Sequence, residues 1–392
     1  MVTPYLVKSL QRSGETPGAV DIARRLAVNF AARAAEHDRD GSFPFANFAE
    51  LAGAGLLALT VPAPLGGTGA AAREAAEVIG VIAQADPSTA LVLTMHYIQH
   101  LLIAAGERYP AHLARRLARE AVDGRGLVNA LRVEPDLGSP SRGGLPATVA
   151  RRTSTGWRLN GHKIYCTGAP ILDWYLVWAR TDEEMPRTGQ FLVPAGAAGA
   201  RIVETWNHLG LRASGSHDVI FEDVDIPADH EVELRRPDSW LPADPLMTAV
   251  HALLLGAIYD GIARAARDWL TGFLNRRAPS SLGAPLATLP RAQEHVGEIE
   301  TRLTINGRLL GSLAGEIDAG TSADPAAANI VKLAVTNNAV AAIETALTLT
   351  GNHGLSRANP LERHFRDVLC GRVHAPQDDA IRIGAGRLAL GR

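Results

Sequence analysis

Cysteine is scarce in this 392-residue chain, and its scarcity excludes two classes of site. Cys166 and Cys370 are the two cysteines, too few for a disulfide framework or for a metal cluster bound by several thiolates. Such low usage is typical of reducing compartments, so the sequence predicts a cytoplasmic protein. His96 and His100, four apart on an expected helix, favour a polar helix face or a pocket wall over a metal site.

Charge of one sign is also missing. The chain has 39 lysine and arginine residues against 41 acidic residues, a net charge of -2, so no strong field attracts nucleic acid or an anionic membrane. Long apolar runs are missing too: the first residues contain no run of signal-peptide length, and Ala252 to Ile258 falls far short of the roughly 20 residues that span a bilayer. We expect a soluble intracellular protein that recognises any partner through local contacts.

The hydrophobic pattern divides the chain into three sections. Residues 1–124 show apolar positions at helical spacing, interrupted by a turn-rich loop at Val61 to Gly69. Residues 125–238 alternate with period two between frequent turn residues, which predicts a small β-barrel or sandwich. Residues 239–392 return to long helical stretches. The predicted class is α+β, mainly α, and the order helices, strands, helices excludes a doubly wound sheet.

Several common motifs of phosphate binding and nucleophilic catalysis are absent. The chain has no GxGxxG after a first strand, no GxxxxGK[ST] and no GxSxG, which argues against a Rossmann site, a P-loop and a serine-hydrolase elbow. The TGNHG segment at Thr350 to Gly354 fits either the end of a helix or a turn that faces a phosphate. The pattern alone favours the helix end.

Several longer sequence motifs give the strongest indication of a protein family. Their order and spacing resemble those of the acyl-CoA dehydrogenase superfamily of flavoproteins, and the resemblance covers nearly the whole chain. It implies a helical N-terminal domain, a central β-domain and a C-terminal four-helix bundle, the same division that the periodicity predicts. The phrases are VPAPLGGTG at 61–69, EPDLGS at 134–139, GWRLNGHKIYCTG at 156–168, LGLRASGSHDVIFEDVDIP at 209–227 and NPLERHFRDVLCG at 359–371.

The resemblance implies a flavin between the β-domain and the C-terminal helices, usually FAD, with FMN as the alternative. Val133 stands where the family has a threonine that bonds the flavin ring, and Pro140 stands where an aspartate usually follows the serine matched by Ser139. Asn129 is a neighbouring polar residue that could replace the missing contact. The family's WITNG phrase matches the segment from Tyr165, which implies a cofactor contact there.

Within that segment the resemblance places the Thr167 hydroxyl near flavin N5, and a strand threonine paired across the sheet is the alternative. Gly351 and Gly354 match a glycine turn that in this family approaches the FAD of a neighbouring subunit. Arg277 is a candidate for the FAD pyrophosphate, with a solvated surface position as the alternative. The family usually forms homotetramers, so we expect a homotetramer or a homodimer.

The position of the family's catalytic base distinguishes its branches. Acyl-CoA dehydrogenases remove a proton α to a thioester with a carboxylate, usually a glutamate shortly after the RD phrase. Aligned without a gap, that position is Ala375, and the position on an earlier helix used by a minority of the family is Ala249. Ordinary dehydrogenation is therefore disfavoured unless the alignment slips and Asp378 or Asp379 serves.

In lacking a carboxylate at the base position, the chain resembles the flavin-dependent monooxygenase branch of the superfamily, which includes dibenzothiophene monooxygenase. Such enzymes receive reduced flavin from a separate reductase and form a C4a-hydroperoxide in a dry pocket. The resemblance implies catalytic roles for His374, His96 and Asn129, although either histidine could instead be a structural residue. We expect a monooxygenase acting on a small organic substrate, with an acyl-thioester dehydrogenase as the alternative. A DNA-binding relative, of the alkylation-response type, is disfavoured by the balanced charge.

Overall fold

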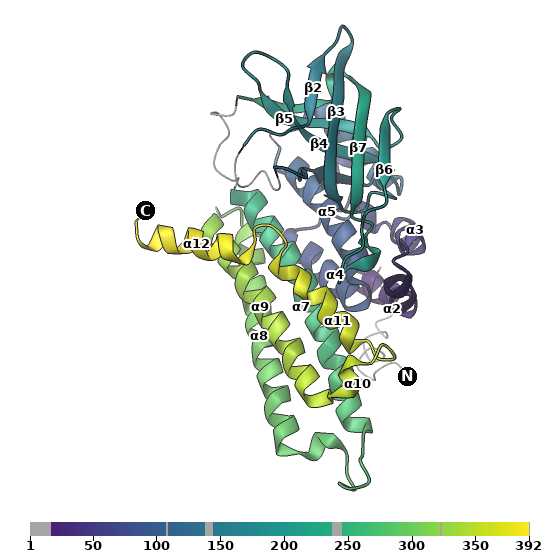
Figure 1. The fold of residues 1–392 in the computed structure, drawn as a ribbon, viewed down its shortest axis with the longest axis vertical. Coiled ribbons are helices and arrows are strands. Elements are labelled where there is room, and N and C mark those ends of the chain that lie inside the picture. The colour runs from purple at the N-terminus through teal and green to yellow at the C-terminus, as the bar shows by residue number, and fades with distance from the viewer. Residues whose placement is uncertain (1–16, 107–108, 138–143, 237–244, 322–323, 392) are drawn as a thin grey trace.

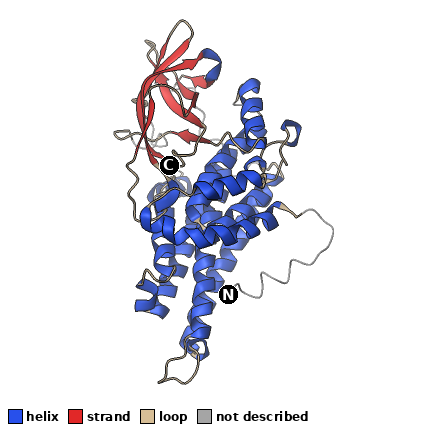
Figure 2. Ribbon diagram, turned by 90° about the vertical axis from the view of Figure 1, so that its right-hand side faces the viewer, coloured by secondary structure: helices blue, strands red, loops and turns tan. Residues whose placement is uncertain are grey.

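The structure, a computed structural model, has a β-domain at one end and helices throughout the rest (Figures 1 and 2). The mainly helical α+β architecture predicted from the sequence is confirmed. Helices precede the strands along the chain and follow them, with no alternation of strand and helix. The residues that the structure describes are 17–106, 109–137, 144–236, 245–321 and 324–391.

The N-terminal section is helical, and Asp86 marks a sharp helix start within it. The Asp86 carboxylate accepts hydrogen bonds from the backbone N–H groups of Ser88 and Thr89 at 3.0 and 3.4 Å, which caps the first turn. The predicted turn-rich loop contains Gly67, where a Cβ would lie 2.3 Å from the Val61 carbonyl oxygen, so only glycine fits. The helices are α2 (Ala19–Asp40), α3 (Phe45–Gly53), α4 (Ala72–Ala85), α5 (Pro87–Ala104) and α6 (Ala111–Val122).

The central section is one sheet rather than two separate ones. Among the described residues it has eight strands in the order β6-β7-β3-β2-β4-β5-β8, and β1 pairs in parallel with β4. Side chains alternate between buried and exposed along β3 and β7, as period-two strands with one covered face require. The strands are β1 (Val128–Leu131), β2 (Val149–Arg152), β3 (Gly156–Cys166), β4 (Trp174–Thr181), β5 (Thr188–Pro194), β6 (Ala200–Val203), β7 (His217–Pro227) and β8 (Glu231–Arg235).

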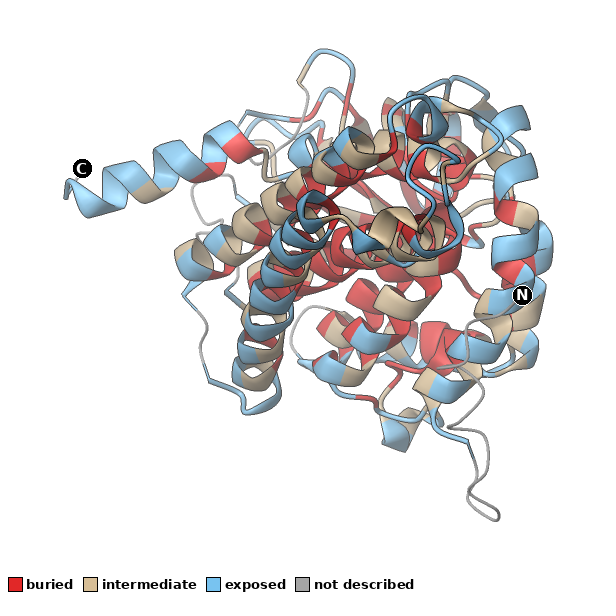
Figure 3. Ribbon diagram, turned by 90° about the horizontal axis from the view of Figure 1, so that it is seen from below, coloured by how far each residue is buried: buried red, intermediate tan, exposed pale blue. Residues whose placement is uncertain are grey.

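The C-terminal section is built around three long helices with α11 packed against two of them. Helix α7 packs against α8 and α9, and α11 contacts α7 and α9. Helix α12 extends away from the bundle (Figures 1 and 3). The helices are α7 (Pro245–Arg276), α8 (Pro290–Asp318), α9 (Pro325–Thr350), α10 (Asn352–Leu355), α11 (Leu361–Leu369) and α12 (Asp378–Ala389).

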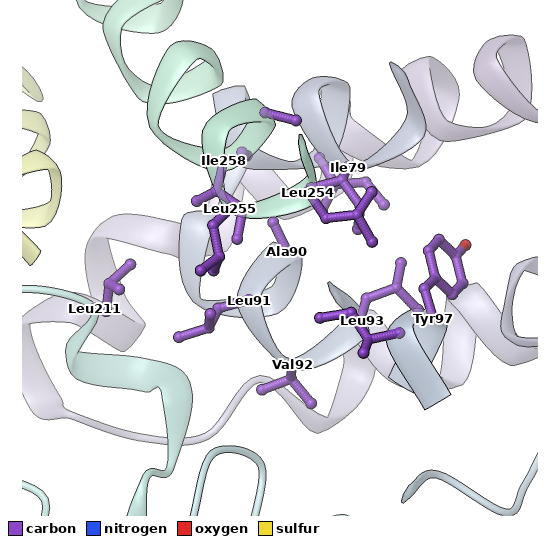
Figure 4. Packing of buried hydrophobic residues seen from close by; sticks show 14 of the residues in the cluster. Ile79, Ala90, Leu91, Val92, Leu93, Tyr97, Leu211, Leu254, Leu255 and Ile258 are labelled. Carbon is purple, nitrogen blue, oxygen red and sulfur yellow. The ribbon is translucent and has the colours of Figure 1, made fainter. Parts of the chain in front are cut away.

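The main hydrophobic core joins the N-terminal helices to the bundle. Ile79 of α4, Ala90 of α5, and Leu254 and Ile258 of α7 are fully buried in one cluster (Figure 4). Leu211, from the loop before β7, belongs to the same cluster. Burial of this apolar surface, at about 25 cal/mol per Å², fixes the start of α7 relative to α5 and the loop beneath the sheet.

Two helices in the described part of the chain are long and apolar enough to cross a membrane by length and composition alone. In α7, 78% of the apolar window is buried inside the protein, and in α9 the figure is 44%. The expectation from the sequence considered uninterrupted apolar runs, whereas polar residues within each of these helices divide its apolar stretch into shorter runs. Helix α7 is the central core helix of the bundle, which explains its composition.

Candidate active site

Thr167 follows the end of β3 and lies in a row of hydroxyl groups. Its Oγ1 is 3.0 Å from Ser216 Oγ, which is 2.8 Å from Ser214 Oγ. Asn129 Nδ2 donates a hydrogen bond to the Thr167 carbonyl oxygen at 3.0 Å. The structure therefore brings Asn129 and Thr167 together, and all four side chains are buried.

Tyr165 places an aromatic ring on the surface beside this row. Its φ of 57° is left-handed, an uncommon and strained conformation for a tyrosine, and its ring is 53% exposed. Trp206 and His208 stack on each other with ring centroids 3.7 Å apart, and both lie nearly perpendicular to the Tyr165 ring at centroid distances of 6.3 and 5.9 Å. Flat rings beside hydroxyl groups fit a flavin, whose ring system is flat with a polar edge.

Val133, which stands where the family has a flavin-bonding threonine, forms a backbone hydrogen bond. The Val133 carbonyl oxygen accepts a hydrogen bond from Ile164 N–H at 3.0 Å, which ties this segment to β3. The valine side chain has no hydrogen-bonding group, so any flavin contact here would come from the backbone. Ser139 and Pro140 lie outside the described residues.

His374 lies in the segment between α11 and α12, at the end of the bundle nearest the sheet (Figure 1). It is half-buried, and its Nδ1 forms a hydrogen bond with the hydroxyl of Tyr259 on α7. Burial, together with the nearby Lys332 and His251, lowers the pKa of His374 to about 4. The ring is therefore neutral near pH 7, so Tyr259 donates to Nδ1 and Nε2 carries the proton.

Neither of the two positions matched to the family's catalytic base has an acidic residue. Ala375 is exposed beside His374, and Ala249 is fully buried near the start of α7. Among the described residues no partner is recorded for His374 Nε2. A neutral imidazole with a free N–H is thus the polar group that this segment offers to a bound molecule.

Two contacts join the loop that leads to the Thr167 row to the helix that leads to His374. The Asp367 carboxylate on α11 accepts a 2.7 Å hydrogen bond from Leu211 N–H, and burial raises the pKa of Asp367 to about 7. A Cβ on Gly210 would lie 2.3 Å from the Arg366 carbonyl oxygen, so the loop crosses α11 closely. That loop leads into Ser214 and Ser216, while α11 leads into His374.

His96 does not share the environment of His374. Its Nε2 is 2.9 Å from the Leu57 carbonyl oxygen, and Val128 N–H donates to its Nδ1 at 3.4 Å. The side chain is fully buried, and burial lowers its pKa to about 4. Backbone groups lie within hydrogen-bond distance of both ring nitrogens, so His96 joins α5 to β1. These contacts favour the structural alternative over the catalytic role that the resemblance implies.

The burial of His96 predicts that the folded protein loses stability as the pH falls. Because the pKa of His96 is lower in the folded state than in the unfolded state, the unfolded chain binds more protons between about pH 6.5 and pH 4. Stability should therefore fall as the pH falls through that window, by about 2 kcal/mol for this residue between pH 7 and pH 5. Urea unfolding of wild type and H96Q at both pH values measures it. An equal pH dependence in the two proteins would refute the assignment.

The remaining predicted cofactor residues lie at the opposite end of the bundle (Figure 1). Arg277 follows α7, and Gly351 and Gly354 follow α9. The His353 ring lies 5.3 Å from that of Phe273 on the last turns of α7. Tyr259, which bonds His374, lies in the middle of α7, and the rest of that helix to Arg276, roughly 26 Å long, separates these residues from His374. One chain cannot bring both groups to the same flavin ring.

Two residues near His374 were missed by the sequence analysis. Tyr259 lies in the middle of α7, and Lys332 is buried in α9. Both meet the His374 segment from more than 40 residues away, and neither belongs to a phrase with a known spacing. The one available signal was the rarity of lysine, which occurs at positions 8, 163 and 332.

Three family models match consecutive parts of the chain. They describe the N-terminal, middle and C-terminal domains of acyl-CoA dehydrogenases and match residues 19–110, 132–224 and 253–378. The YdbM protein of Bacillus subtilis, whose name places it provisionally among acyl-CoA dehydrogenases, is 33% identical over 91% of this chain and 92% of its own length. The chain belongs to the acyl-CoA dehydrogenase superfamily. It is a flavin-dependent oxidoreductase of that superfamily, with the predicted three-domain fold.

Other relatives within the superfamily differ in named activity. The L-evernosamine nitrososynthase of a Micromonospora species is 30% identical over 95% of this chain and 90% of its own length. The solved structure of KijD3 with FMN and a dTDP-linked amino sugar is 29% identical, with a TM-score of 0.84 over 97% of this chain and 95% of that chain. The superfamily is settled, and the relatives divide between dehydrogenase and nitrososynthase names.

Proposed function

We propose that this protein is a flavin-dependent monooxygenase that acts on a small organic substrate. The observation that carries the proposal is the His374 segment. It offers a neutral imidazole N–H where acyl-CoA dehydrogenases hold a carboxylate, and both matched base positions are alanine. A neutral donor cannot remove a weakly acidic carbon-bound proton as a carboxylate does, but it can stabilise negative charge that develops on oxygen.

Residues on one side of the proposed site would bind the flavin, and residues on the other would form hydrogen bonds with the reacting oxygen. When bound in its reduced form, the flavin supplies two electrons to molecular oxygen; one oxygen atom enters the substrate and the other leaves as water. Thr167, with its carbonyl held by Asn129, holds the polar edge of the ring. Tyr259 fixes the His374 tautomer, which would leave Nε2–H to donate a hydrogen bond to the reacting oxygen. The buried hydroxyl row and the apolar core around it exclude water.

The proposal includes cofactor, partners and location. KijD3 has been solved with FMN, which supports FMN as well as FAD here. Reduced flavin would come from a separate reductase. The separation of Arg277 and Gly351 from the His374 end supports a homotetramer or homodimer in which a second copy completes the flavin site. Two cysteines and no disulfide among the described residues fit a cytoplasmic protein.

The substrate class that we favour is a primary amine. Several relatives that this chain matches at 28 to 31% identity are named nitrososynthases, and their names specify amino sugars or evernosamine. Protein, reduced FMN and ¹⁸O₂ should convert one or more members of an amine panel that includes amino sugars to a product containing ¹⁸O. Consumption of oxygen with hydrogen peroxide as the sole product, across the whole panel, would refute the proposal.

A second candidate, an acyl-thioester dehydrogenase, is favoured by one observation. The Asp378 side chain is buried, and its Oδ1 has no hydrogen-bond partner, while Oδ2 accepts a 2.9 Å bond from Asn337. If Asp378 were the displaced base, an acyl-CoA panel would bleach bound oxidised flavin without oxygen, and D378N would abolish the bleaching. The monooxygenase proposal predicts no bleaching by any chain length.

A further inference from the structure

Lysine is rare in this chain, and its placement is unusual. The 39 basic residues include only three lysines, at positions 8, 163 and 332. The two that the structure describes, Lys163 and Lys332, are both fully buried, whereas lysine is normally among the most exposed residue types. Lys163 has a carboxylate partner, Glu134, at 2.6 Å. Lys332 has a different kind of environment.

Lys332 Nζ donates to three backbone carbonyl oxygens of one short segment. Its acceptors are the carbonyls of Gly371, His374 and Pro376, at 3.0, 2.7 and 2.9 Å. No carboxylate within the described ranges lies at ion-pair distance from it, although the charge of nearby Asp378 favours its protonated form. Burial dominates and lowers the pKa of Lys332 to about 8. All three N–H donors of the ammonium group are used.

Arginine would not serve at this position. Its planar fork matches the two oxygens of a carboxylate or phosphate, whereas three carbonyl oxygens that converge on one point suit the compact ammonium group. A chain that uses arginine at nearly all of its other basic positions keeps lysine here. The same segment also meets α9 tightly: a Cβ on Gly371 would lie 3.2 Å from the Thr336 methyl carbon.

We propose that Lys332 is a positioning residue that clamps the Gly371–Pro376 segment and so holds His374 in the active site. The inference rests on the proposed role of His374 and deepens it. Two groups fix that histidine from different helices: Tyr259 of α7 binds the ring, and Lys332 of α9 binds its backbone carbonyl. Without Lys332 three carbonyls, one buried and two partly buried, lose their donor, and the segment that follows α11 is released.

The test compares K332M, K332Q and a control, T336V. Met removes every donor at similar volume, Gln keeps one N–H₂ group, and Thr336 lies one turn further along α9 with its hydroxyl bonded to its own helix. Hydrogen exchange, measured without flavin, should show faster exchange confined to peptides spanning residues 370–377. The increase should be largest in K332M, smaller in K332Q and absent in T336V.

A functional measurement separates positioning from general loss of structure. FMN affinity, from quenching of flavin fluorescence, should change less than about twofold in K332M, while ¹⁸O incorporation per reduced flavin falls about 100-fold, the size expected for a misplaced catalytic group. Unchanged exchange in residues 370–377, or equal losses of affinity and coupling, would overturn the inference. If wild type incorporates no ¹⁸O, the proposed function fails, and the exchange experiment still decides whether Lys332 clamps the segment.

Discussion

Replacing His374 with alanine should lower the yield of oxygenated product per reduced flavin by about 100- to 1,000-fold, within the range for loss of a positioned proton donor. The reduced flavin should still react with oxygen, so hydrogen peroxide should appear in place of product. Product and peroxide, quantified together in single-turnover reactions, measure the change. FMN affinity should stay close to that of wild type because His374 is separate from the Thr167 row.

The physical reason lies in the tautomer that the fold imposes. Tyr259 donates to His374 Nδ1, and the pKa of the ring is lowered to about 4 by burial and by Lys332 and His251. At pH 7 the ring therefore presents an Nε2–H donor rather than a base. Y259F, which removes the hydroxyl that selects this tautomer, should give a smaller loss of product, of about 10-fold.

A matched control is available on the surface of the bundle. His295 of α8 is partly exposed beside Glu298 and far along the chain from the site, so H295A should leave the ratio of product to peroxide unchanged. An H374A protein with an unchanged ratio would remove His374 from the mechanism. The proposal would then lose the observation that distinguishes it from dehydrogenation.

The second large effect concerns stability. E134Q should destabilise the protein by about 3 to 5 kcal/mol, because it leaves the ammonium group of Lys163 buried without its counter-charge. The Glu134 carboxylate also accepts hydrogen bonds from the backbone N–H groups of Ala147 and Thr148 and from the Thr148 hydroxyl. The pair therefore joins β3 to the segment before β2. Urea unfolding at pH 7 measures the change.

Two comparisons make the stability prediction specific. E183Q, which breaks the partly exposed pair with Arg187, should cost less than about 1 kcal/mol. The double variant E134Q/K163M should recover most of the loss in E134Q, because no charge stays buried and the glutamine amide oxygen can still accept from the backbone N–H groups. A small effect of E134Q, comparable to that of E183Q, would show that the buried pair does not anchor β3.

The architecture was predictable because it depends on local periodicity. The change from helical spacing to period two near residue 125, and back near residue 239, places the sheet between two helical sections. The phrase from Tyr165 to Gly168 spans the end of β3, and the RD phrase lies on α11. Each of these features is determined by residues close together in the chain.

The roles of the two histidines could not be predicted in the same way. His96 and His374 both matched a branch of the superfamily, yet their hydrogen-bond partners come from distant segments. Backbone groups at Leu57 and Val128 occupy both nitrogens of His96, whereas within the described part of the chain the ring of His374 bonds Tyr259 through Nδ1. Which imidazole keeps a free N–H depends on packing between helices and sheet, and one sequence does not show that packing.

The most direct test of the central claim mixes protein that holds reduced FMN with oxygen and follows the return of oxidised flavin absorbance. The account predicts two phases, with a slow second phase that shortens about 100-fold in H374A. A single fast phase in wild type, with one hydrogen peroxide released per flavin and no difference in H374A, would contradict it.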